Sequence, residues 1–160
     1  MLEIERKFLM DGFPTGLELI SEVDIEQGYL SFEPELRIRK AVDKSTGIEE
    51  FWMTIKGEGD LSRKETETAI SSDFYRDTVE FLNGKVLRKD YKKYQFGPWE
   101  LEVSLVDSGT EWEFYYAEIE FPTEQDAKAF EVPAYFGEEI TYNKEYKMKN
   151  YWKRTRESLF

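Results

Sequence analysis

Acidic and basic side chains alternate with other residues at the start of the chain, in residues 2–9. Glu3, Glu5 and Lys7 occupy every second position there. Successive side chains of a β-strand point to opposite faces, so this spacing places all three on one face. Two carboxylates and an ammonium group on one face can bind a cation and an anion together. Taken alone, the same pattern is also typical of the solvent-facing side of an ordinary antiparallel strand.

Similar alternation recurs in five further segments, 36–40, 51–56, 62–70, 99–105 and 115–121. The charged faces of these segments carry Arg37 and Arg39, Lys56, Arg63 with Glu65 and Glu67, Glu102, and Glu118 with Glu120. Several of these faces contain charges of one sign only. Adjacent like charges on one strand face repel, so selection for stability does not explain them.

Strands that each carry one charged face can close into a barrel with those faces inward. Inward carboxylates then require compensation, because burial and mutual repulsion both oppose their ionisation. Divalent cations would supply it, and inward lysines and arginines would require a multivalent anion. A polyphosphate bridged to the carboxylates by metal ions satisfies both demands. The pattern therefore predicts metal and polyphosphate binding, without specifying a reaction.

The composition restricts the chemistry further. The chain has 160 residues, 40% of them hydrophobic, which fits one domain spanning residues 1–160. It contains no cysteine and no histidine, which excludes thiolate and imidazole ligands and leaves oxygen-binding cations such as Mg²⁺, Mn²⁺ or Ca²⁺. A net charge of −12 disfavours extended nucleic-acid binding or anionic membranes. Since no long apolar segment is present, we expect a cytoplasmic protein.

Three helices are expected outside these strands, at residues 73–83, 124–131 and 143–157. The first ends at Asn83-Gly84, a common helix C-terminal signal, and the second follows the capping residue Thr123. The basic run from Lys147 to Arg156 is interpreted as a solvated helix end, because the chain is acidic overall.

Seven motifs occur in an order that resembles one family. They read Glu3-Ile-Glu5-Arg-Lys7, Gln27-Gly-Tyr-Leu, Leu36-Arg-Ile-Arg, Met53-Thr-Ile-Lys-Gly, Leu61-Ser-Arg-Lys-Glu-Thr-Glu, Glu118-Ile-Glu-Phe and Tyr135-Phe-Gly-Glu-Glu-Ile-Thr. Over residues 2 to about 150 the chain resembles the CYTH, or triphosphate tunnel metalloenzyme, family, and most of all its short bacterial inorganic triphosphatases. This resemblance implies an α+β fold, with an eight-stranded antiparallel barrel forming a tunnel and a few helices packed outside.

The resemblance also implies roles for individual residues. Glu3, Glu5, Lys7, Lys56 and Tyr29 would act in catalysis. Phosphate groups would be bound by Lys7, Arg37, Arg39, Lys56 and Arg63, together with Arg88 or Lys89. Mg²⁺ or Mn²⁺ would be bound among Glu3, Glu5, Glu65, Glu67, Glu102, Glu118, Glu120 and Glu139. Relatives generally have aspartate where this chain has Glu102.

Residues 86–91 depart from the family pattern, which usually carries Lys-x-Arg on this strand. One alignment puts Arg88 in the place of the lysine and Asp90 in that of the arginine. A shift of one residue keeps Lys89 but puts Tyr91 where the arginine is expected, and it reverses which face points inward. Either alignment loses one cation.

The predicted activity is hydrolysis of inorganic tripolyphosphate, or of a nucleoside or RNA 5′-triphosphate. The alternatives are a class IV-type adenylate cyclase, a thiamine triphosphatase, and a polyphosphate- or nucleotide-binding module without catalysis. The expected partner is a small molecule that contains a triphosphate. The sequence does not fix the oligomeric state, and a homodimer is one alternative.

Overall fold

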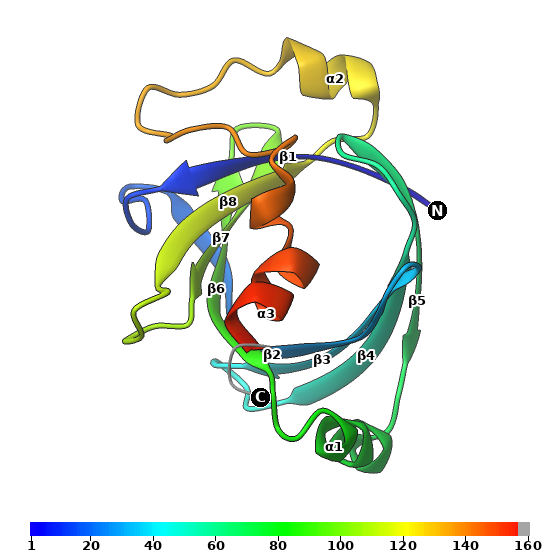
Figure 1. The fold of residues 1–160 in the computed structure, drawn as a ribbon. Coiled ribbons are helices and arrows are strands. Elements are labelled where there is room, and N and C mark those ends of the chain that lie inside the picture. Colours follow the sequence, from blue (N-terminus) through cyan, green and yellow to red (C-terminus); the bar gives the residue numbers. More distant parts are fainter. Residues whose placement is uncertain (157–160) are drawn as a thin grey trace.

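Eight antiparallel strands form a closed barrel in the structure, a computed structural model that describes residues 1–156. The strands are β1 (Leu2–Met10), β2 (Glu18–Phe32), β3 (Glu35–Asp43), β4 (Glu49–Lys56), β5 (Ser62–Ala69), β6 (Leu87–Phe96), β7 (Trp99–Val106) and β8 (Phe114–Glu120). Around the barrel their order is β1-β5-β4-β3-β2-β6-β7-β8 (Figure 1). The predicted α+β class and eight-stranded antiparallel barrel are confirmed.

Strand β1 closes the barrel by pairing with two different neighbours. Its first residues pair with β5, where Glu3 lies opposite Arg63. The rest of the strand pairs with β8, where Glu5 lies opposite Glu120 and Lys7 opposite Glu118. The N-terminal motif is therefore placed at the closure of the barrel, next to both acidic strands.

One of the two hydrophobic clusters lies outside the barrel wall, because the alternation turns apolar side chains away from the tunnel. Phe8, Leu101 and Ile119 are fully buried there. They belong to a cluster that includes Ala127 of helix α2 (Glu124–Ala129) and Phe136 in the loop that follows. The side chain of Thr123 caps α2 by accepting a hydrogen bond from the Asp126 N–H, as the sequence predicts, although the helix ends two residues earlier than expected.

Helix α1 (Ser72–Phe81) packs near β3 on the outer wall. Its N-terminus is capped by Ser71. It is followed by Asn83 and Gly84, whose φ angles are +54° and +73°. Glycine adopts this left-handed conformation without steric cost, so the stop signal ends the helix as predicted.

The C-terminal segment differs from its prediction. In place of one helix over 143–157, the described residues form a short 3₁₀ helix η1 (Lys144–Tyr146) and then helix α3 (Met148–Arg156), separated by the extended backbone of Lys147. Residue 157 lies outside the described residues. Helix α3 lies across one opening of the barrel instead of on its outer wall (Figure 1).

Aromatic packing and a buried ion pair anchor α3. Trp152 packs against Tyr29 and Phe32, with ring centroids 6.0 and 5.9 Å apart. Arg156 is 9% exposed and pairs with Asp107 at 2.6 Å. The interpretation of the basic run as a solvated helix end is therefore wrong for Arg156, because this guanidinium is an internal anchor.

Among the described residues, no helix combines the length and apolar character needed to cross a membrane.

Candidate active site

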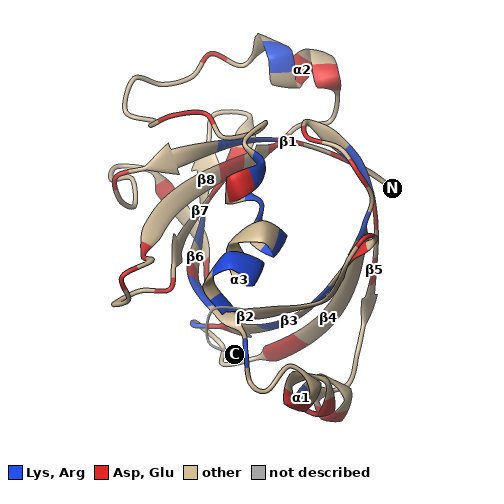
Figure 2. Ribbon diagram, in the orientation of Figure 1, with Lys and Arg blue, Asp and Glu red and all other residues tan. Residues whose placement is uncertain are grey.

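The barrel encloses a cavity of about 330 Å³, and each of the eight strands contributes side chains to its wall. Most of the lining residues are charged or polar. Figure 2 shows acidic and basic positions on the strands around this opening and basic positions on α3, which lies over it. The wall is polar because the same alternation that builds the outer core turns the charged faces inward.

Seven of the eight acidic residues named from the sequence line this cavity. They are Glu3, Glu5, Glu65, Glu67, Glu102, Glu118 and Glu120. They come from β1, β5, β7 and β8, which are consecutive around the closed barrel in the order β5-β1-β8-β7. The carboxylates therefore form one acidic sector of the wall.

Glu139 is the exception. Its carboxylate accepts hydrogen bonds from Arg6 Nη2 at 2.7 Å and Arg6 Nε at 2.9 Å. Arg6 alternates with Glu5 and Lys7 along β1, so its side chain lies on the opposite face of that strand. The structure therefore does not place Glu139 in the tunnel wall, and its assignment as a lining residue is corrected.

Six of the seven predicted phosphate-binding residues also line the cavity. They are Lys7, Arg37, Arg39, Lys56, Arg63 and Lys89. Arg37, Lys56 and Lys89 are each at most 7% exposed. Cations are rarely this buried unless they are paired, so the wall is built to receive negative charge.

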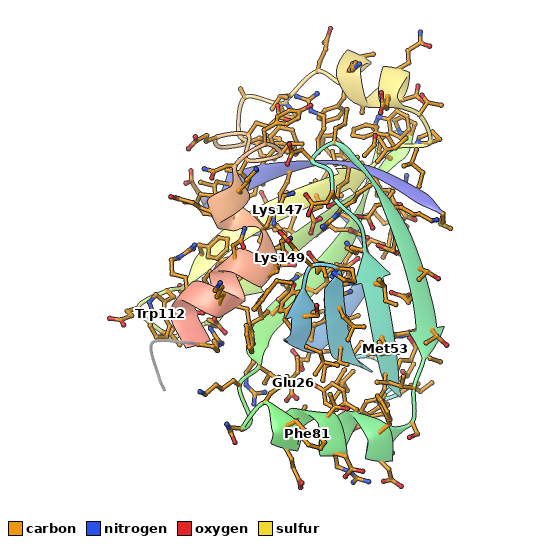
Figure 3. All side chains as sticks on the ribbon, turned by 45° about the vertical axis from the view of Figure 1, so that its right-hand side comes forward. Glu26, Met53, Phe81, Trp112, Lys147 and Lys149 are labelled. Carbon is orange, nitrogen blue, oxygen red and sulfur yellow. The ribbon has the colours of Figure 1, made fainter. Side chains whose placement is uncertain are left out.

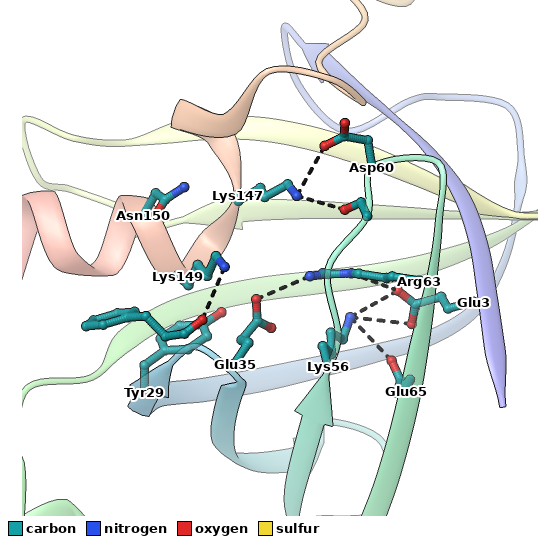
Figure 4. A network of polar contacts seen from close by, with 12 residues as sticks. Glu3, Tyr29, Glu35, Lys56, Asp60, Arg63, Glu65, Lys147, Lys149 and Asn150 are labelled. Carbon is teal, nitrogen blue, oxygen red and sulfur yellow. Dashed lines mark hydrogen bonds and ion pairs between the residues drawn. The ribbon is translucent and has the colours of Figure 1, made fainter.

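Four of these cations form a cation sector on the remaining strands β4-β3-β2-β6, namely Lys56, Arg37, Arg39 and Lys89. Ion pairs hold part of the wall in place (Figure 4). Lys56 Nζ lies 3.0 Å from a Glu3 oxygen and 3.3 Å from a Glu65 oxygen. Arg63 pairs with Glu35 at 3.2 Å. These side chains are therefore ordered before any substrate arrives, which reduces the entropic cost of binding.

Glu5 and Glu118 form a coupled pair of buried carboxylates. Burial and the neighbouring negative charge of Glu118 raise the pKa of Glu5 well above its ordinary value. Burial alone would also raise the pKa of Glu118, but Lys7, a hydrogen bond with Glu5, and Lys89 lower it overall. The pKa of Glu5 is therefore raised and that of Glu118 lowered within one buried pair, and a bound cation would favour ionisation of both carboxylates.

The donor chemistry of the acidic sector fits a hard divalent cation. All candidate ligands are carboxylate oxygens, and burial raises the pKa values of Glu3, Glu5 and Glu102. Within residues 1–156, however, no three acidic side chains converge into a ready-made metal cage. This arrangement suits Mg²⁺ better than a closed Ca²⁺ site, because Mg²⁺ is usually held by one or two carboxylates together with substrate oxygens and water.

Tyr29 lies on the basic side of the cavity and is 2% exposed. Its hydroxyl accepts a hydrogen bond from Gln27 Nε2 at 2.6 Å. Gln27 Oε1 in turn accepts one from Arg39 Nη2 at 3.0 Å. Tyr29 is therefore connected through Gln27 to Arg39, one of the residues predicted to bind phosphate.

The register of β6 decides between the two alignments of residues 86–91. Lys89 and Tyr91 line the cavity, and Lys89 is 5% exposed. The Arg88 side chain is 70% exposed and pairs at 2.8 Å with Glu26, which Figure 3 places beside α1. The alignment that keeps Lys89 is correct, and the substrate-binding assignment of Arg88 is wrong, because adjacent residues of a strand point to opposite faces.

We expect Lys89→Ala to lower triphosphate turnover about 10- to 100-fold, because the substitution removes a hydrogen bond from Lys89 to a charged phosphate group. Arg88→Ala is the matched control on the same strand, and it should stay within about two-fold of the parent protein because exposed ion pairs contribute little. Steady-state phosphate release by both variants checks this. A larger loss for Arg88→Ala than for Lys89→Ala would contradict the inward position of Lys89.

Several lining residues were missed from the sequence, namely Glu35, Asp60, Ser104, Tyr116 and Lys147. Tyr116 and Ser104 share inward faces with Glu118 and Glu102, so period two could have identified them. Lys147 could not be identified this way, because it follows η1 and belongs to no strand. Its ammonium donates to the Gly59 carbonyl at 2.8 Å and pairs with Asp60 at 3.2 Å, which links the α3 segment to the β4–β5 loop (Figure 4).

Comparisons with known proteins agree with this geometry. No family model matches the chain. A curated inorganic triphosphatase of Nitrosomonas europaea is 36% identical over 152 residues, covering 93% of this chain and 95% of that protein. A crystal structure of an inorganic triphosphatase superimposes with a TM-score of 0.65 at 33% identity, covering 93% of both chains.

A Pyrococcus horikoshii protein shares the fold, with a TM-score of 0.59 at 19% identity, covering 78% of this chain and 80% of that one. The similarity to the N. europaea relative extends over nearly the full length of both chains. Together with the closed eight-stranded tunnel and the charged motifs on its inner wall, it shows that the chain belongs to the CYTH, or triphosphate tunnel metalloenzyme, family.

Proposed function

We propose that this protein hydrolyses inorganic triphosphate in its tunnel, with Mg²⁺ or Mn²⁺ as the metal. The observation that carries the proposal is one enclosed wall that contains both the acidic sector, which supplies the carboxylates, and the cation sector. Neither sector alone is electrostatically satisfied, and a metal–triphosphate complex would compensate both. The N. europaea relative, an inorganic triphosphatase, supports the same assignment.

The cation sector would bind and orient the triphosphate. Arg37 and Arg39 lie on β3 and Lys89 lies on β6, the two strands that flank β2 in the closed barrel, so they offer a preorganised set of donors. Such donors stabilise charge that develops on phosphate oxygens without rearranging during the reaction. Catalysis in this proposal is therefore mostly positioning and charge stabilisation.

The carboxylate sector would hold the metal. Glu5 and Glu118 are the leading ligands, because their carboxyl groups are both buried in the tunnel wall and lie within hydrogen-bonding reach of each other, which concentrates negative charge there. A divalent cation supplies Lewis-acid polarisation of phosphate oxygens and a means of activating water. The remaining inner carboxylates would position that water and accept its proton, since the chain has no histidine to do so.

The proposal treats residues 1–160 as one catalytic domain. Strand β1 at the N-terminus closes the barrel against β8, and Tyr151 and Trp152 of α3 pack against barrel residues at the other end of the chain. The enclosed, charged wall suits a small polyphosphate better than an extended nucleic acid.

A substrate panel with purified protein tests the proposal. Tripolyphosphate, ATP, thiamine triphosphate and pyrophosphate would each be incubated with Mg²⁺, Mn²⁺ or EDTA, and released phosphate measured. We expect metal-dependent release that is fastest with tripolyphosphate. Absence of metal-dependent release with all four compounds, combined with calorimetric binding of tripolyphosphate, would replace the hydrolase with a binding module. Cyclic AMP formation from ATP would instead indicate a cyclase.

A further inference from the structure

Tyr116 is the most deeply buried tyrosine of the tunnel wall. It lies on β8, two residues before Glu118, and only 1% of it is exposed. The alternation of β8 turns its side chain into the cavity, on the face that carries Glu118 and Glu120. Nothing in the proposed function uses this residue.

The ring of Tyr116 supports two lysines of the tunnel wall, Lys7 of β1 and Lys89 of β6. Lys7 Nζ lies 4.2 Å from the ring centroid and Lys89 Nζ 5.2 Å from it. Neither ammonium forms an ion pair within 4.0 Å of a carboxylate in residues 1–156. Two buried cations of like charge near one aromatic ring repel each other, and the π-electrons of the ring partly offset that repulsion.

The hydroxyl of Tyr116 makes no hydrogen bond of normal geometry with a described residue, although Ser104, its neighbour across the β7–β8 ladder, comes close enough to affect its pKa. Buried hydroxyl groups nearly always have a partner, so this one requires an explanation. The only other buried side-chain polar atom without a partner in the described part of the chain is Arg37 Nε. Arg37 lines the same cavity, and both groups can donate a hydrogen bond.

A purely structural role does not account for this hydroxyl. Phenylalanine would fill the same space and present the same ring face to Lys7 and Lys89, without burying a polar group. An unpartnered buried hydroxyl costs free energy that the fold does not recover. The cost is explained if an anionic oxygen enters the cavity and accepts the hydrogen bond.

We infer that Tyr116 is a substrate-binding residue, whose hydroxyl donates a hydrogen bond to a phosphate oxygen while its ring seats Lys7 and Lys89 on either side of that group. This inference rests on the proposed function for the identity of the anion. It assigns Tyr116 two separable roles, one carried by the hydroxyl and one by the ring.

Two substitutions separate these roles. Tyr116→Phe removes the hydroxyl and keeps the ring, and Tyr116→Leu removes both. Tyr115→Phe is the matched control, because Tyr115 is adjacent on β8, points to the other face and packs edge-on against Phe13 at 5.2 Å. Thermal denaturation of each variant establishes that it is folded.

The measurement is calorimetric binding of tripolyphosphate in EDTA, together with KM and kcat in Mg²⁺. We expect Tyr116→Phe to weaken binding and raise KM about ten-fold, the loss of a hydrogen bond to a charged acceptor. Tyr116→Leu should lose more, and Tyr115→Phe should match the parent. Unchanged binding by Tyr116→Phe, within two-fold of the parent, would overturn the inference. If the parent protein shows no turnover but Tyr116→Phe still binds tripolyphosphate more weakly than the parent, the inference is supported and the proposed hydrolase activity is removed.

Discussion

Replacing Glu5 with glutamine is expected to lower metal-dependent triphosphate turnover by about 10²- to 10³-fold, the range found when one preorganised electrostatic group is removed from an active site. Glutamine has nearly the same shape, so the barrel keeps its packing. It has no negative charge, however, and cannot replace a carboxylate as a ligand for a hard cation. The substitution therefore removes one of the two adjacent carboxylates, Glu5 and Glu118, at the centre of the acidic sector.

The same substitution should stabilise the protein in EDTA. Burial and the charge of Glu118 raise the pKa of Glu5 above its ordinary value of 4.5. A group with a raised pKa in the folded state favours folding at a pH below its unfolded pKa, and this contribution is lost as the pH rises through the folded pKa. At pH 7 to 8 the parent protein therefore carries a penalty that Glu5→Gln removes, and we expect the variant to have the larger free energy of unfolding.

Thermal denaturation at several pH values checks the sign. The variant should melt above the parent at pH 8 in EDTA, and the difference should shrink as the pH falls towards 4.5. Adding Mn²⁺ should raise the melting temperature of the parent more than that of the variant, because a ligand stabilises the state that binds it. Glu111→Gln, an exposed glutamate in the β7–β8 loop, is the control. A Glu5→Gln protein that retains parental turnover would exclude Glu5 as a metal ligand.

The residues of the inner tunnel wall were largely predictable from the alternation of side chains between the two faces of each strand. Glu3, Glu5 and Lys7 share a face by geometry alone, and so do Arg37 and Arg39. What the alternation could not give was the closure of the barrel, because strand order depends on contacts between residues far apart in the sequence. That step depended on the resemblance to a known family.

The strand at 87–96 could not be assigned a register from its own residues. Its two faces carry Arg88, Asp90 and Lys92 or Lys89, Tyr91 and Lys93, and both are polar. A hydrophobic pattern fixes register only where the two faces differ. In the structure the neighbouring strands fix it, because Lys89 lies opposite Ile25 of β2 and Val106 of β7.

The errors at Glu139 and Arg156 have a common cause. Each side chain has a partner distant in sequence, Arg6 for Glu139 and Asp107 for Arg156. Glu139 was predicted to line the tunnel because of its position in a family motif. Arg156 was predicted to be solvated because it lies near the end of a predicted helix. Local sequence describes neither pairing, because tertiary packing alone brings these partners together.

The ion pair between Asp107 and Arg156 leads to the largest expected effect on stability. Asp107 accepts hydrogen bonds from Arg156 Nη2 at 2.8 Å, from Arg156 Nη1 at 2.6 Å and from the Arg88 N–H at 3.0 Å. The Tyr151 hydroxyl also donates to it. These bonds tie α3 to the β7–β8 loop and to the start of β6, and so keep the helix over the opening of the tunnel.

We expect Asp107→Asn to destabilise the fold by roughly 3–5 kcal/mol, because it leaves the buried Arg156 guanidinium without its counter-charge. Asparagine tolerates the φ angle of +47° at this position, so backbone strain does not add to the effect. The control is Asp73→Asn in the exposed Asp73–Arg76 pair of α1, which should change stability little. Urea denaturation measures both changes.

The pH dependence of this effect identifies its origin. Burial alone would raise the pKa of Asp107, but hydrogen bonds from Arg156, Tyr151 and the Arg88 N–H outweigh it and lower the pKa below the ordinary value of 3.8. A lowered pKa contributes stability above the unfolded value, and this stability is lost as the pH falls through the folded value. The gap between the parent and Asp107→Asn should therefore be full at neutral pH, begin to narrow near pH 4 and continue to narrow as the pH falls through the folded pKa of Asp107. A gap that persists unchanged at pH 3 would show that asparagine disturbs packing and not charge, and the ion pair would then not be what holds α3 over the tunnel.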